Sequence, residues 1–218
     1  MKTPEGWRQV SMGEVAVPGG IQTGPFGSQL HSADYTPTGI PVIMPKDMKF
    51  GRVDAGTVSK VPLRVVEKLS QHMLKPGDIV FARRGDIGRC CLIGEVEDGW
   101  LCGTGSLRVR PDSSASPEFL FNCLQASEPQ TWLNDNAVGQ TMLNLSATIV
   151  SGIPLLLPPL PEQKKIAEIL GSVDEAIRAT KALIEQTRRV KQGLLQQLLT
   201  RGIGHTRFKM TEIGEIPE

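Results

Sequence analysis

The sequence lacks the features that mark exported, membrane-bound or strongly charged proteins. No charged-then-apolar leader follows Met1, and no apolar run approaches the roughly eighteen residues of a membrane-spanning helix. We therefore expect a cytoplasmic protein that binds no membrane. Lys and Arg number 24 against 23 Asp and Glu, a net charge of +1, so overall charge does not indicate a nucleic-acid partner.

Signatures of metal or catalytic chemistry are missing as well. Four cysteines lack the paired two-residue spacing of zinc sites, and the three histidines are scattered, so we expect buried thiols at Cys90, Cys91, Cys102 and Cys123. Gly103-Thr104-Gly105 has no third glycine to complete a dinucleotide loop. Leu157-Pro158-Pro159-Leu160 has neither the polar residue nor the aromatic ring with which an adenine methyltransferase holds a flipped base. The sequence predicts a protein that is not an enzyme and has no cofactor or metal.

What is present predicts one mixed α/β (α+β) globular domain followed by a long helix. A chain of 218 residues, 39% of them hydrophobic, can bury one core and spare residues for an extended arm. Residues 1–157 alternate Gly and Pro punctuation with strand-like runs at 40–45, 78–83, 90–96, 106–110 and 153–157. Helical spacing recurs at 63–70 and 117–126. We expect a curved, partly barrel-like sheet.

From Pro161 to Leu199 apolar residues recur every three or four positions, which predicts a single helix within a segment spanning residues 158–202. Pro161 suits a first helical position, and Gly202 can close the last turn. Such a helix would be roughly 60 Å long, more than its own domain can cover, so we expect coiled-coil-like packing against another chain. The alternative is that the helix only closes its own domain's core. The expected contact residues are Ile166, Leu170, Val173, Ile177, Ile184, Leu194 and Leu198.

Charge is unevenly distributed along the domain. Residues 46–92 hold ten basic and five acidic side chains, whereas residues 112–135 hold four acids and no Lys or Arg. A solvated surface is the ordinary explanation. DNA binding is the competing explanation. In that case arginines among glycines would contact bases, other basic side chains would contact phosphates, and Gln, Asn and Thr would contact adenine and thymine. These candidates are, in that order, Arg83, Arg84 and Arg89; Lys46, Lys49 and Arg52; and Gln140, Thr141 and Asn144.

Several local patterns, taken in order, resemble the specificity subunit of type I restriction-modification systems. They cover nearly the whole chain: Pro4-Glu5-Gly6-Trp7; Gly24-Pro25-Phe26-Gly27-Ser28 with Tyr35 and Gly39-Ile40-Pro41-Val42; Gly77-Asp78-Ile79-Val80-Phe81-Ala82-Arg83 with Gly85-Asp86-Ile87-Gly88; and Leu145-Ser146, Ile153-Pro154-Leu155 and Leu157-Pro158-Pro159-Leu160-Pro161-Glu162-Gln163. The resemblance implies a non-catalytic scaffold that reads half of a split DNA site. It also implies modification (methyltransferase) subunits as partners and, through them, the restriction subunit.

A complete member of that family has two recognition domains alternating with two antiparallel helices, and this chain resembles one half. Residues 203–218 form a tail in which Ile216-Pro217-Glu218 echoes Thr3-Pro4-Glu5, so a second domain after Glu218 and a natural half-subunit both stay open. This chain has one such helix and no second one to cover its apolar residues, which predicts a homodimer through antiparallel helices. The rival hypothesis from another class is a coiled-coil adaptor that binds protein and no DNA.

Overall fold

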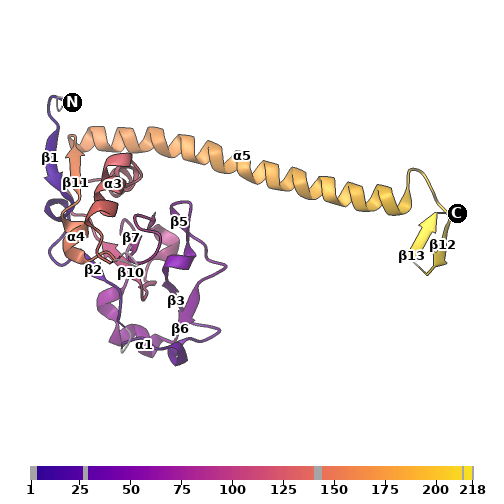
Figure 1. The fold of residues 1–218 in the computed structure, drawn as a ribbon, viewed down its shortest axis with the longest axis horizontal. Helices are drawn as coiled ribbons and strands as arrows, with labels where there is room; N and C mark the ends of the chain where they lie inside the picture. Colours follow the sequence, from indigo (N-terminus) through magenta and orange to yellow (C-terminus); the bar gives the residue numbers. More distant parts are fainter. Residues whose placement is uncertain (1–3, 27–28, 140–143, 213, 218) are drawn as a thin grey trace. The chain divides into compact units, whose positions relative to one another are not determined.

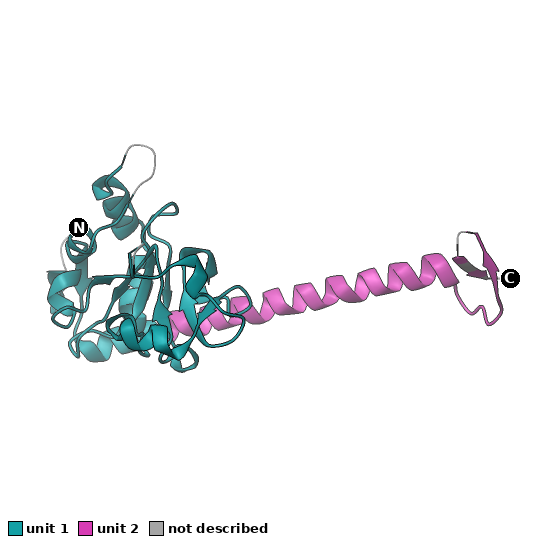
Figure 2. Ribbon diagram, turned by 90° about the horizontal axis from the view of Figure 1, so that it is seen from below, with its two compact units in different colours: residues 1–167 teal, residues 168–218 magenta. Residues whose placement is uncertain are grey.

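The computed structural model describes residues 4–26, 29–139, 144–212 and 214–217. The chain divides into two compact units, residues 1–167 and 168–218 (Figure 2). The predicted boundary at residue 157 is the end of a strand, whereas the first unit also includes the first residues of the long helix.

Unit 1 is built on small sheets, most of them antiparallel, because its strands are short and interrupted by Gly and Pro (Figure 1). The described residues form a four-stranded sheet in the order β2 (Gln22–Thr23), β10 (Ser106–Val109), β7 (Ile79–Ala82), β8 (Cys90–Leu92); a three-stranded sheet in the order β6 (Ser59–Val61), β3 (Ile40–Ile43), β9 (Leu101–Cys102); and the pairs β1 (Arg8–Ser11) with β11 (Pro154–Leu157) and β4 (Met48–Lys49) with β5 (Arg52–Val53). Only β3 and β9 pair in parallel within these sheets.

Helices cover the sheets and complete the core of unit 1. They are α1 (Leu63–Lys68), α2 (Pro117–Leu124), α3 (Ser127–Asn136) and α4 (Ala147–Ser151), with 3-10 turns at Met12–Val15, Ser32–Asp34, Pro45–Asp47, Ser70–His72 and Glu95–Glu97. The α2 helix begins with a Ser116 side chain that accepts a hydrogen bond from Phe119 N, and Pro117 occupies its first turn. Phe81, Leu107 and Leu120 are fully buried in the largest apolar cluster.

The mixed α/β class is confirmed, and each predicted strand and helix contains an observed one. The expected single curved, barrel-like sheet is instead divided into separate small sheets. Cys90, Cys91 and Cys102 are buried as predicted, whereas Cys123 is half-buried. Burial raises the pKa of the Cys90 and Cys102 thiols to about 12. Among the described residues, no group of three His, Cys, Asp or Glu side chains is placed to hold a metal ion.

The junction between β11 and the long helix brings together two sequence motifs, the one that ends at Trp7 and the one that ends at Gln163. β1 lies beside β11, with Arg8 opposite Leu157 (Figure 1). Trp7 Nε1 donates a hydrogen bond of 3.3 Å to Glu162. Gln163 is 1% exposed: its Oε1 accepts from Ser116 N at 2.8 Å, and its Nε2 donates to the carbonyls of Ser114 and Pro158. The start of the helix is therefore fixed to the loop that precedes α2.

The long helix α5 runs from Leu160 to Arg201, close to the predicted bounds. Gly202 follows with φ +66°, a left-handed conformation that suits glycine, and its N–H reaches the Leu198 carbonyl. A hairpin of β12 (Phe208–Thr211) and β13 (Gly214–Pro217) completes unit 2, and the Arg201 guanidinium lies over the Phe208 ring. None of the described helices combines the length and apolarity needed to cross a membrane.

Two alternatives for the helix were predicted, and the structure separates them along its length. Ile166 packs against the core of unit 1 and Ala167 is buried in it, so the first turns close their own domain. Ile166 is thus partly covered by its own domain, and its contact with a partner chain stays a prediction. The remaining six predicted contact residues are 42–52% exposed: Leu170, Val173, Ile177, Ile184, Leu194 and Leu198.

Replacing Gln163 by Ala should lower the free energy of unfolding by about 1–3 kcal/mol, because Ser116 N and the Ser114 carbonyl would lose a buried partner. Urea unfolding followed by tryptophan fluorescence measures the change. Gln192→Ala, on an exposed turn of the same helix, is the matched control. Equal stability of the two variants would show that Gln163 does not secure the junction.

Candidate functional site

The structure brings together two of the three predicted clusters, although 62 residues separate them along the chain. Arg83 accepts a hydrogen bond of 2.9 Å from Leu145 N, and its Nε donates one of 2.9 Å to the Leu145 carbonyl. Next to them Arg84 and Asn144 form an antiparallel bridge. Arg83 N also donates to the Gly105 carbonyl, so the Gly103-Thr104-Gly105 turn belongs to the same surface.

The two neighbouring arginines have different surroundings. Arg83 is half-buried, and its guanidinium lies over the Phe26 ring, 5.0 Å from the centroid. Burial, and then the nearby charge of Arg84, lower the pKa of Arg83. Arg84 is exposed. Arg83 therefore holds the surface together, and Arg84 is the side chain with access to a ligand.

The glycine-containing turn that follows is fixed to helix α3. Gln130 Nε2 donates to the carbonyls of Gly88 and Leu124. Arg89 is half-buried, and its Nε lies 3.4 Å from the Asp86 carboxylate in an ion pair whose geometry gives no hydrogen bond. The predicted turn exists, but Arg89 is directed to its own loop and is a weaker candidate than Arg84 for contact with a ligand.

The polar segment predicted to read adenine is described only in part. Gln140 and Thr141 lie outside the described residues. Asn144 pairs through its backbone with Val138. Its Oδ1 atom is buried without a hydrogen-bond partner among the described residues, as is Thr104 Oγ1. Two unpaired polar atoms at one surface are unusual, because buried polar groups are normally satisfied.

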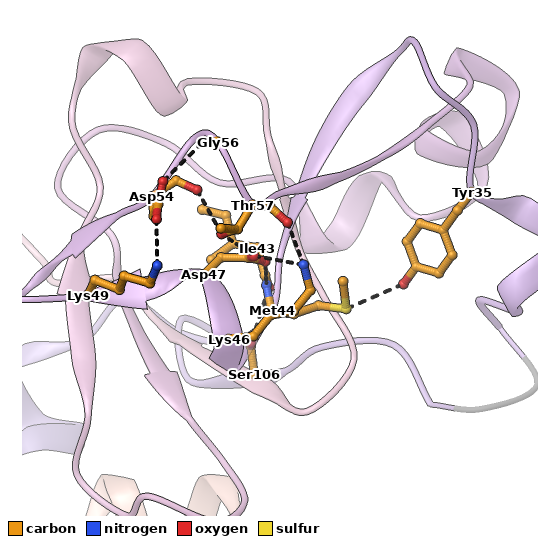
Figure 3. A network of polar contacts seen from close by, with 10 residues as sticks. All are labelled: Tyr35, Ile43, Met44, Lys46, Asp47, Lys49, Asp54, Gly56, Thr57 and Ser106. Carbon is orange, nitrogen blue, oxygen red and sulfur yellow. Dashed lines mark hydrogen bonds and ion pairs between the residues drawn. The ribbon is translucent and has the colours of Figure 1, made fainter. Parts of the chain in front are cut away.

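The two lysines of the third cluster, predicted to contact phosphates, lie beside carboxylates of the chain (Figure 3). Lys46 Nζ lies 3.0 Å from Asp47 Oδ1 and also donates to the Thr57 carbonyl. Lys49 Nζ lies 2.7 Å from Asp54 Oδ2. A phosphate would have to compete with these carboxylates, and contact of Lys46, Lys49 and Arg52 with phosphates stays a prediction. Arg52 is exposed.

Asp47 is the centre of that cluster and is fully buried. It accepts hydrogen bonds from Met44 N at 2.9 Å and from Thr57 Oγ1 at 2.8 Å, and its carbonyl accepts from Asp54 N (Figure 3). These contacts hold the two ends of the β4–β5 hairpin together. Pro45, beside Asp47, packs against Gly105, which joins this cluster to the surface around Arg83.

A cleft elsewhere on unit 1, lined by Gln71, Lys75, Arg108 and Arg110, is a poorer site for an anion than its two arginines suggest. All three side-chain nitrogens of Arg108 donate to carbonyl oxygens of the chain or to Gln22. Arg110 makes a bidentate pair with buried Asp78, which raises the pKa of Arg110. These arginines are occupied in holding strand β10 to its neighbours.

A sequence profile of the family described as "Type I restriction modification DNA specificity domain" matches residues 4–189. The chain belongs to this family. It is 38% identical over 101 residues to the type I restriction enzyme MjaVIII specificity subunit of Methanocaldococcus jannaschii, which covers 46% of this chain and 23% of that relative. It is 26% identical over 220 residues to the EcoKI specificity subunit of Escherichia coli strain K12, covering 97% and 45%.

The fold agrees with that family. The crystal structure of the HsdS subunit from Thermoanaerobacter tengcongensis superposes with a TM-score of 0.60 at 23% identity, covering 91% of this chain and 50% of that one. The specificity domain described here thus spans about half the length of the specificity subunits that it matches.

The different surroundings of Arg83 and Arg84 predict different effects on stability. Arg83→Ala removes the bond to the Leu145 carbonyl and the contact with Phe26, and should destabilise the domain by about 1–2 kcal/mol. Arg84→Ala should change stability by less than about 0.5 kcal/mol. Thermal unfolding of both variants measures this. Equal losses for the two would contradict the assigned roles.

Proposed function

We propose that this specificity domain binds duplex DNA, recognises one half of a bipartite site, and acts as the specificity half-subunit of a type I restriction-modification complex. The observation that carries the proposal is the convergence of Arg84, Asn144 and the Gly103–Gly105 turn on one surface of a chain in this family. A guanidinium beside an amide is a pair of groups that reads guanine and adenine edges in the major groove.

Within this proposal the basic side chains have different roles. Arg84 is exposed and next to Asn144, so it is the first choice for a base contact. Arg52 is the first choice for a phosphate contact. Lys46 and Lys49 contribute positive potential, although each already has a carboxylate partner.

The long helix supplies the assembly function. An exposed apolar stripe of this length is an association surface. The stripe repeats with the spacing of a coiled-coil seam. The polar members Thr180 and Thr187 donate their hydroxyls to the Ala176 and Leu183 carbonyls, so a second helix can cover them without leaving a donor unpaired.

The proposed partners are a second copy of this chain through antiparallel helices, and modification subunits through which a restriction subunit joins. The methyl donor would be bound by the modification subunits, so the specificity domain itself performs no catalysis. We expect this complex to act on DNA in the cytoplasm. The competing proposal, an adaptor that binds protein and no DNA, is separated from this one by DNA binding itself.

The purified chain should retain a specific duplex from a random pool, with affinity falling steeply as salt rises. Arg84→Ala should weaken binding of that duplex by about 1–3 kcal/mol and bind a scrambled duplex as before. Arg52→Ala should weaken both duplexes alike and reduce the salt slope by about 1. Fluorescence anisotropy at several salt concentrations measures these changes. No retained duplex at low salt would support the adaptor.

The chain should form a dimer whose DNA site is an inverted repeat, because two identical domains related by a two-fold axis require one. The half-sites should lie about one duplex turn, roughly 34–36 Å, apart. Ile177→Asp with Ile184→Asp should yield monomers that bind DNA weakly, since both charges fall in the exposed stripe.

Ala179→Asp with Ala182→Asp adds the same charge outside the seam and should leave the dimer intact. Analytical ultracentrifugation measures the assembly of each variant. An unmutated chain that stays monomeric at high concentration, or a selected site without two-fold symmetry, would rule out the homodimer.

A further inference from the structure

Charged side chains divide the long helix α5 into two halves of opposite sign. Residues 160–175 hold four acidic and two basic side chains, whereas residues 176–201 hold six basic and one acidic. A second copy lying parallel would set acid against acid and base against base. A second copy lying antiparallel sets each acidic half against a basic half. The charge pattern therefore favours two helices of this same sequence that run in opposite directions.

Lys191 is the charged residue of the apolar seam, and it makes the direction of the second helix matter. It lies seven residues after Ile184 and seven before Leu198, so the three occupy one column of the heptad pattern. In a parallel pair each seam residue faces its own copy, and two ammonium groups would meet between apolar side chains. Such a contact between like charges is strongly unfavourable away from water. In an antiparallel pair Lys191 faces a different residue.

One antiparallel register gives every residue of the seam a facing partner. A shift of the second copy by one heptad in one direction leaves Leu198 beyond the start of the facing helix at Leu160. A shift in the other direction sets Lys181 beside Arg188, a contact between like charges. In the register between these two, each polar seam residue faces an apolar one. Its facing pairs are Ile166–Leu198, Leu170–Leu194, Val173–Lys191, Ile177–Thr187 and Thr180–Ile184.

A shallow groove in the exposed stripe fits this register. Among its lining residues Val173, Ala176, Ile177 and Thr180 have the spacing of the four-residue hole that receives one seam residue from a facing helix. Thr187 of the second copy lies opposite the centre of this hole. Because the Thr187 hydroxyl donates to the Leu183 carbonyl of its own helix, the threonine can enter the groove without leaving a donor unpaired.

Asp174 borders the seam and is exposed. In this register it lies beside Arg188 of the second copy. Lys191 of the second copy faces Val173, and its long side chain can carry the ammonium group out of the seam to the same carboxylate. Arg188 Nη1 lies 2.8 Å from Glu185 Oε1 of its own helix. Each Arg188 would therefore have one carboxylate on its own helix and one on the other, a small network of charges at the edge of the interface.

We propose that Asp174, Arg188 and Lys191 set the direction and the register of the helix pair, so that a second copy of this chain is recognised in one alignment only. The proposal rests on the dimer proposed above and adds to it the residues that face each other. The apolar residues supply the affinity, because they are removed from water in any alignment. The three charged residues exclude the parallel and the shifted alignments, as charges within and beside a coiled-coil seam do.

Disulfide cross-linking of cysteine variants measures the register. Chains carrying Ile177→Cys mixed with chains carrying Thr187→Cys should form a covalent dimer, because these positions face each other. Neither variant alone should do so, since each position lies roughly 15 Å along the axis from its own copy. The unmutated chain, oxidised in the same way, shows any contribution of the native cysteines.

A covalent dimer of Ile177→Cys chains with themselves would show a parallel pair and overturn the proposal. A dimer in sedimentation that gives no covalent product in the mixture has another register and overturns it as well, leaving dimerisation standing. A chain that stays monomeric overturns both proposals.

Charge reversal tests the named residues. Asp174→Arg should raise the dissociation constant of the dimer about tenfold, because the change occurs twice in the pair and sets arginine beside Arg188 and Lys191. Adding Arg188→Asp to that variant should restore most of the affinity. Glu175→Arg is the matched control, since the same charge change falls on the outer side of the helix and should have little effect. Sedimentation at several concentrations measures all three. Equal effects of Asp174→Arg and Glu175→Arg, or no recovery in the double variant, would overturn the assigned roles.

Discussion

The candidate surface depends on the pair of hydrogen bonds between Arg83 and Leu145. They connect the end of strand β7 to the segment that precedes helix α4, and so they bring Arg84 beside Asn144. Because the same arginine lies over Phe26 and donates through its backbone to Gly105, four separate segments meet at one residue. Arg83 therefore has a structural role, and its exposed neighbour Arg84 is the candidate for contact with a ligand.

A second constraint acts at the junction of domain and helix. Gln163 satisfies three backbone groups in a site closed to solvent, and Trp7 and Glu162 meet nearby. The helix is thereby fixed in its first turns, and its remaining apolar residues are left exposed. The helix therefore has two roles along its length. Its first turns belong to the core of unit 1, and the rest offers a surface for another chain.

Local patterns predicted what depends on local forces. Apolar residues at every third or fourth position predicted α5, and Gly202 marked its end, because both signals are contained in the segment itself. The α3 helix was missed because Ser127–Asn136 is mostly polar and includes Pro129, which is tolerated only in a first turn. β1 was missed because its partner β11 lies at the other end of the domain sequence.

The site was predicted only as separate clusters, again because the contacts that join them lie between residues far apart in the sequence. Arg83, Arg84 and Asn144 each had a local signal, but their contact depends on chain segments 62 residues apart. The carboxylates that occupy Lys46 and Lys49 were visible in the sequence only as nearby acids, since one-dimensional spacing does not show which side chains face each other. The two-residue turn at Phe50-Gly51 had no signal in the sequence, because Phe-Gly is not a usual turn pair.

Hydrogen–deuterium exchange of the backbone amides, with and without a selected duplex, tests the central claim that this surface binds DNA. The account predicts slowed exchange at residues 83–89, at the turn around residue 104 and at residues 144–146, while helix α1 exchanges as in the free chain. Protection confined to the α5 stripe or to α1, with the segment around Arg84 unchanged, would contradict it.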